Sequence, residues 1–186
     1  MSPKAPSAGQ TRVYLPATLA TLADAYVSGA FGSGYAAHAV TGAMREWYVE
    51  GDLEELEYAA LSEAADASLR LLAGELAAEA RYEHRRVVVA ADVADACVQA
   101  MGEQAGGPDG PATARSAVRI GCPVRLSAVV SVHLDEDAPQ VRRAVAAALA
   151  ALPAADAGDD DAAFVVDEAR AHELLWYDVT EIVDLI

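Results

Sequence analysis

Histidine and carboxylate side chains are the groups in this sequence whose types and spacing could support catalysis. His133 and Asp135 stand two residues apart in a predicted strand, so both side chains lie on the same strand face. An imidazole beside a carboxylate suits a general base, and the same spacing suits a surface pair at the end of a strand. His172, next to Glu173, is the third candidate catalytic residue. No nucleophile stands at a diagnostic spacing from these groups, so the sequence defines no reaction.

The spacing of the histidines and cysteines excludes zinc-protease, zinc-finger and thioredoxin-type motifs. The order His172-Glu173 begins like the zinc-binding helix of a metalloprotease, but Trp176 stands where that motif requires a second histidine. Cys97 and Cys122 are far apart, and the absence of a C-x-x-C pair excludes zinc fingers and thioredoxin-type sites. We expect the two cysteines to be small buried thiols.

Three aspartates that follow predicted strands are the candidate metal ligands: Asp92, Asp135 and Asp167. Ligands of open α/β sheets bind beyond the carboxyl ends of the strands, and carboxylates that converge there suit Mg²⁺. The alternative is that these residues begin helices, as Thr18 and Thr41 are also expected to do, because a side-chain oxygen satisfies free N–H groups in a first turn. Magnesium is the one cofactor that the sequence leaves open.

Two Trp-Tyr pairs are the candidate partner-binding residues. Arg45 precedes Trp47 and Tyr48, and the second pair is Trp176 and Tyr177. Arginine, tryptophan and tyrosine are enriched at the centres of protein interfaces. The alternative is that each pair packs into the core, with its polar atoms hydrogen-bonded.

Composition narrows the class of protein. The chain has 186 residues, of which 54% are hydrophobic, so it is long enough for one domain with a sizeable core. Its formal net charge of −16 argues against nucleic-acid binding, which depends on cationic side chains that neutralise phosphates. No apolar run is long enough to span a membrane, and the N-terminus does not resemble a secretory signal. We therefore expect a cytoplasmic protein.

Strands interleave with helices along the chain. The run Val87-Val88-Val89-Ala90-Ala91 predicts a central strand that is covered on both faces, with Asp92 at the start of a helix. Thr18 and Gly29 bound one predicted helix, and Asp52 with Glu55 resembles the capping box of a long one. Further strands are predicted at 12–16, 35–40, 118–122, 130–134 and 164–166, and further helices at 41–48 and 137–152.

This alternation predicts an α/β or α+β fold, with a mixed or mostly parallel sheet layered with helices. Residues 1–11 are expected to form a disordered tail, because they are short of apolar residues and rich in Pro, Ser and Gly. Residues 12–186 would form one domain, with flexible loops near 102–115 and 154–162.

Five stretches together resemble a family of short conserved hypothetical actinobacterial proteins with no assigned activity. They are Arg12–Thr18, Arg45–Tyr48, Glu54–Ala60, Arg86–Asp92 and His172–Tyr177. The resemblance spans most of the chain outside the tail and the loops. It implies a cytoplasmic bacterial protein, and it brings no catalytic residues with it.

Two functions follow from these observations. The sequence favours a non-enzymatic, soluble domain that binds a protein partner or a second copy of itself through the Trp-Tyr pairs. The alternative is a Mg²⁺-dependent enzyme that acts on a small molecule or a phosphate ester, with carboxylates at the strand ends.

Overall fold

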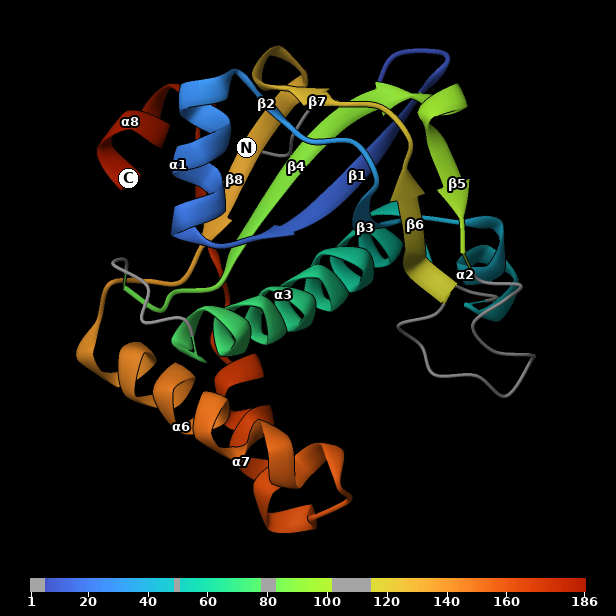
Figure 1. Cartoon of the computed structure of the whole chain (residues 1–186). Coiled ribbons are helices and arrows are strands. Elements are labelled where there is room, and N and C mark those ends of the chain that lie inside the picture. The colour runs from blue at the N-terminus through green and yellow to red at the C-terminus, as the bar shows by residue number, and fades with distance from the viewer. Residues whose placement is uncertain (1–5, 49–50, 78–82, 102–114) are drawn as a thin grey trace.

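A curved antiparallel sheet forms the centre of the protein in the computed structural model, which describes residues 6–48, 51–77, 83–101 and 115–186 (Figure 1). Within these residues, seven strands form the main sheet in the order β5-β6-β3-β1-β4-β8-β9. In sequence order the strands are β1 (Gln10–Ala17), β3 (Tyr35–Ala39), β4 (Val87–Ala94), β5 (Val98–Ala100), β6 (Ala117–Ile120), β8 (Val129–Leu134) and β9 (Leu175–Tyr177).

Every strand pair in this sheet is antiparallel, so the expectation of a mostly parallel sheet was wrong. A continuous apolar run is typical of strands with both faces covered, and burial is independent of strand direction. Val87 to Ala91 are all buried because helices cover both faces of the central strands. The expectation of mixed α/β structure in one domain was confirmed.

The two faces of the sheet carry different side chains. Val13, Leu15, Val87 and Val89 point to the face that is covered by α1 (Leu19–Ser28), where the largest apolar cluster lies. Alternate residues of the same strands point to the other face, which α3 (Leu53–Ala77) crosses (Figure 1). The short α8 (Ile182–Leu185) joins the first cluster through Ile182.

A helical hairpin packs on the side of α3 that faces away from the sheet (Figure 1). It consists of α6 (Pro139–Asp156) and α7 (Asp160–Arg170). The predicted strand at 164–166 was wrong, because these residues belong to α7, with Val166 and Ala169 buried at helical spacing. A three-residue apolar run does not distinguish strand from helix. The loop predicted at 154–162 is reduced to the three residues between the helices, and the other predicted loop falls mainly on 102–114, outside the described residues.

Several local signals were correct. The side chain of Thr18 caps α1, and Gly29 ends this helix with a φ of 82°, a conformation that glycine adopts readily. Thr41 caps α2 (Gly42–Trp47), and Asp52 and Glu55 form the expected capping box of α3.

Two predictions about residues near strand ends were wrong. Asp92 lies inside β4 rather than at a helix start, because the strand continues to Ala94, and only the single turn η1 (Asp95–Cys97) follows. Cys97 and Cys122 are not free thiols but form a disulfide, since the pairing of β5 with β6 brings their Cα atoms to 5.6 Å. Sequence spacing carries no signal for such a contact.

Short elements complete the fold. The strands β2 (Ala30–Phe31) and β7 (Val124–Arg125) form a second, two-stranded sheet. The single turns η2 (Leu126–Ala128) and η3 (Val179–Glu181) precede β8 and α8. In the described part of the chain, no helix combines the length and the apolar character that crossing a membrane demands.

Candidate functional site

Polar side chains occupy the part of the α3-facing sheet surface that α3 leaves open. Strand alternation places Arg12 and Tyr14 of β1 on this face, while Val13 and Leu15 point to the opposite core. The same alternation places Ser131 and His133 of β8 on the α3 side. The sheet therefore presents hydroxyl, guanidinium and imidazole groups where an apolar face is usual.

A small residue at the centre of this surface leaves room for a cavity. In the register of the sheet, Tyr14 lies opposite Ala90, and Ala90 lies opposite Ser131. The methyl group of Ala90 cannot fill the space between its larger neighbours, and a cavity of about 390 Å³ lies above it. Its volume falls in the range of small-molecule sites.

We call this space the α3 cavity, and its lining comes from the sheet, from α3 and from the segment that leads into β9. The lining residues are Arg12, Tyr14, Glu57, Tyr58, Leu61, Ser62, Glu63, Ala65, Asp66, Arg86, Ala90, Ser131, His133, Arg170, His172, Glu173, Leu174 and Trp176.

Arg12 is buried at one end of the cavity beside β4. Its Nε and Nη2 atoms donate to the Asp92 carboxylate at 2.5 and 3.1 Å. Burial, followed by the charge of Glu57, raises the pKa of Tyr14, so the phenol stays protonated. Asp92 thus fixes the Arg12 guanidinium in the cavity wall that also contains Tyr14.

Ser131 and His133 form a second polar pair in the cavity. The hydroxyl Oγ of Ser131 lies 3.1 Å from Nε2 of His133. Desolvation, followed by the charge of Arg12, lowers the pKa of His133 to about 4. The imidazole is therefore neutral at pH 7 and can accept or donate a hydrogen bond.

Two glutamates of α3 face these groups from the opposite wall. Desolvation raises the pKa of Glu57 and also that of Glu63. The Oε2 atom of Glu63 is buried, and it has no hydrogen-bond partner within the part of the chain that the structure describes. A buried polar atom without a partner is unusual in folded proteins and is common where a ligand or water binds.

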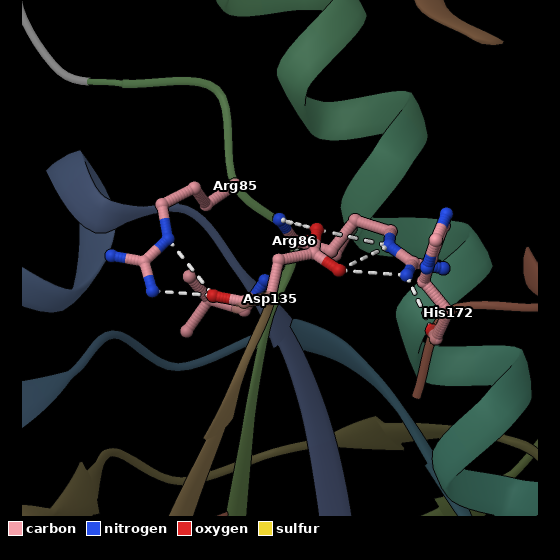
Figure 2. Close-up of polar contacts among 6 residues, drawn as sticks. Arg85, Arg86, Asp135 and His172 are labelled. Carbon is pink, nitrogen blue, oxygen red and sulfur yellow. Dashed lines mark hydrogen bonds and ion pairs between the residues drawn. The ribbon is translucent and has the colours of Figure 1, made fainter. Parts of the chain in front are cut away.

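The segment that leads into β9 forms the third wall of the cavity. The buried ion pair of Asp135 with Arg86, drawn in Figure 2, holds this segment in place. The Asp135 carboxylate accepts from the main-chain N–H of Arg86 at 2.7 Å and from its guanidinium, with Nη2–Oδ1 at 2.7 Å. The same Nη2 atom donates to the main-chain carbonyl of His172 at 2.8 Å. Arg85 donates to the main-chain carbonyl of Asp135. Asp135 and Arg86 therefore hold the segment that leads into β9 against the sheet.

Two aromatic side chains stand at the cavity mouth. Trp176 lies opposite His133 in the pairing of β9 with β8, and 47% of its surface is exposed. Tyr58, on α3, is also exposed and lines the same cavity. The cavity therefore has a polar floor and an aromatic mouth.

The structure brings two of the three predicted catalytic residues together. His133 and His172 both line the α3 cavity. Asp135 does not bind His133, because its carboxylate is fully engaged behind the cavity with Arg86. The predicted pairing of His133 with Asp135 was therefore wrong.

The predicted metal ligands do not converge. Asp92 pairs with Arg12, Asp135 with Arg86, and Asp167 with Arg170 on the surface of α7. In the described ranges, no group of three or more His, Cys, Asp or Glu side chains is placed to hold a metal ion. Each aspartate instead neutralises a neighbouring arginine.

The predicted partner-binding residues lie on separate parts of the fold. Trp47 and Tyr48 are exposed at the end of α2, and the guanidinium carbon of Arg115 lies 3.7 Å from the centroid of the Trp47 ring. Arg45 is exposed and Met44 is buried on the same helix, so α2 is amphipathic, but Trp47 and Tyr48 do not pack into the core. Trp176 lines the cavity, and its neighbour Tyr177 packs against the largest apolar cluster.

Sequence reasoning missed the residues that complete the site: Arg12, Tyr14, Glu57, Glu63 and Ser131. A signal was present in β1, where Arg12 and Tyr14 alternate with apolar residues inside an otherwise buried strand. Charged residues are almost never fully buried unless they are paired, so an arginine inside this apolar strand predicts a carboxylate partner.

Comparison with known proteins identifies a family without a known activity. Residues 11–186 match the sequence profile of a family described as a family of unknown function (DUF6912), and the chain belongs to this family. No curated protein and no solved structure matches the chain.

Proposed function

We propose that this protein binds a small molecule in the α3 cavity, as a binding protein rather than an enzyme. The supporting observation is that polar side chains from two walls converge on one cavity: Arg12, Tyr14, Ser131 and His133 from the sheet, and Glu63 from α3. A concave pocket with a few convergent polar groups and shifted pKa values is the usual form of a ligand site.

The unsatisfied oxygen of Glu63 supports the same proposal. Its Oε2 atom lacks a protein partner among the described residues, although the carboxyl group is desolvated enough to raise its pKa. A ligand that donates a hydrogen bond would satisfy this atom. The neutral imidazole of His133 and the hydroxyl of Ser131 would accept or donate at the other wall.

The two tryptophans provide a direct test of ligand binding in the α3 cavity. They are similarly exposed, at 47% for Trp176 and 55% for Trp47, but of the two only Trp176 lines the cavity. In a Trp47→Phe variant, Trp176 is the one remaining tryptophan, and cavity ligands from a fragment library should change its fluorescence saturably. The matched Trp176→Phe variant, which keeps Trp47, should show no such change.

A cavity-filling substitution locates the site independently. Ala90→Leu places a larger side chain on the cavity floor and should abolish binding of every hit, as followed by NMR chemical shifts. Ala36→Leu is the matched control, since Ala36 is exposed on β3 and does not line the cavity. If no fragment in a broad library gives a shift that Ala90→Leu removes, the proposal is wrong.

Protein binding is a second candidate function, supported by the exposed aromatic group on α2. Trp47 and Tyr48 are both exposed beside Arg45, and exposed tryptophan and tyrosine are typical of interface centres. The occupant would be a second copy of the chain or a protein partner. Light scattering after size exclusion would test self-association: a wild-type monomer at high concentration would exclude the homodimer.

The cellular context stays a prediction. Actinobacterial origin and a cytoplasmic location were expected from the resemblance and from composition. A disulfide between Cys97 and Cys122 is unusual in the cytoplasm of most organisms, where thiols are kept reduced. Mass spectrometry of alkylated protein from native cells would measure the free thiols and so test the location.

A further inference from the structure

We infer that the ligand of the α3 cavity is an organic cation, an amine or a quaternary ammonium compound with an apolar body. This inference rests on the proposed binding function. The arginines of the cavity are paired with aspartates, whereas several carboxylates form no ion pair among the described residues. Aromatic and apolar side chains line the cavity beside these carboxylates.

The arginines of the cavity are occupied by the protein itself. Arg12 is held by Asp92, Arg86 by Asp135, and Arg170 by Asp66 and Asp167. The Arg86–Asp135 pair is fully buried and the Arg12–Asp92 pair is partly buried, and removal of one partner from a buried pair is strongly destabilising. An anionic ligand would have to compete with these carboxylates for its arginines.

Three carboxylates of the cavity have no arginine within ion-pair distance among the described residues, although the charges of Arg12 and Arg45 act on Glu57, and that of Arg170 acts on Glu63, over longer distances. Glu57, Glu63 and Glu173 line the space and form no ion pair with the other described residues. Among the described residues, four carboxylates and three arginines line the cavity, and each of these arginines is also paired with an aspartate outside the lining. The local charge therefore favours a cation.

The aromatic mouth selects the same class of ligand. A cation over the face of a tryptophan or tyrosine ring is attracted by the negative charge of the ring face, most strongly for tryptophan. Trp176 and Tyr58 stand at the opening, while Leu61 and Leu174 provide apolar surface for the rest of the molecule. A cationic head with an apolar body matches this lining.

Three probes with one carbon skeleton separate charge from shape: 2-phenylethylamine, 2-phenylethanol and phenylacetate. Binding is measured by titration calorimetry on the full chain and by the fluorescence of Trp176 in the Trp47→Phe variant. We expect the amine to bind at least ~10-fold more tightly than the alcohol, since one such cation–π contact or charged hydrogen bond is worth about that factor. Phenylacetate should bind more weakly than the alcohol.

Glu63→Gln tests the assigned carboxylate and preserves its shape. It should weaken the amine ~10-fold and leave the alcohol unchanged, whereas Glu168→Gln, an exposed control on α7, should change neither. Circular dichroism of each variant confirms folding.

The outcomes separate this inference from the proposed function. Equal affinity for amine and alcohol, or tighter binding of phenylacetate, would contradict the inference of a cationic ligand. The proposal that the cavity binds small molecules would still stand. If none of the three probes binds at millimolar concentration, the inference of a cationic ligand is also wrong. A negative fragment screen would then contradict the proposed binding function itself.

Discussion

Replacement of Asp135 by asparagine is the most informative perturbation of the framework behind the cavity. The Asp135 side chain is 1% exposed and that of its partner Arg86 is 2% exposed. The carboxylate accepts from the main-chain N–H of Arg86 and from two of its guanidinium nitrogens (Figure 2). In Asp135→Asn, the amide nitrogen cannot accept, and the guanidinium keeps a buried charge without a counterion.

The expected cost is large compared with ordinary surface changes. Breaking a buried ion pair by removing one partner costs about 3–5 kcal/mol. With a urea slope of about 2 kcal/mol per molar, the midpoint of unfolding should fall by about 1.5–2.5 M. Circular dichroism during urea titration at pH 7 gives this midpoint directly.

An exposed pair with similar geometry serves as the control. Arg70 donates to both oxygens of Asp156 at 2.7 and 2.9 Å, and both side chains are 53% exposed. Asp156→Asn should barely move the midpoint, because water screens the pair and solvates either partner alone. If Asp135→Asn shifted the midpoint no more than Asp156→Asn, burial would not govern the strength of these pairs.

Three further results are expected. Burial lowers the pKa of both His38 and His133 to about 4. Below pH 6.5 the unfolded chain therefore binds more protons than the folded protein. The free energy of unfolding should fall as the pH drops from 6.5 to 4, by up to about 3 kcal/mol for each imidazole. Urea titrations at several pH values measure this loss, and His38→Asn or His133→Asn should make it shallower. Reduction of the Cys97–Cys122 disulfide should lower the free energy of unfolding by about 3 kcal/mol, because it opens a loop with a sequence separation of 25, and urea titration with and without reductant measures the difference. Millimolar Mg²⁺ should leave the melting temperature of the wild type unchanged in a thermal-shift assay, since Asp92 is held by an arginine. A clear rise in the melting temperature would support the predicted metal site.

Part of the site was readable in the sequence. His133 and His172 were named as candidates, and both line the cavity. Asp135 was named for the wrong role, since its neighbours in the chain suggested a partner on its own strand, while the actual partner, Arg86, is 49 residues away. No spacing rule links two residues at that distance.

Much of the fold was decided locally and so could be predicted. The caps at Thr18 and Thr41, the end at Gly29 and the capping box of Asp52 with Glu55 satisfy backbone groups within three or four residues of each other. The burial of Val87 to Ala91 likewise follows from an apolar run, whatever the direction of its neighbours.

The amino-acid sequence by itself determined which residues form most helices and strands, because hydrogen bonds in turns and the periodicity of side chains act over a few residues. Only the tertiary structure decided the antiparallel order of the sheet, the disulfide and the α3 cavity. Each of these depends on contacts between segments far apart in the chain: Ala90 opens a cavity only because the registers of β1 and β8 place Tyr14 and Ser131 on either side of it.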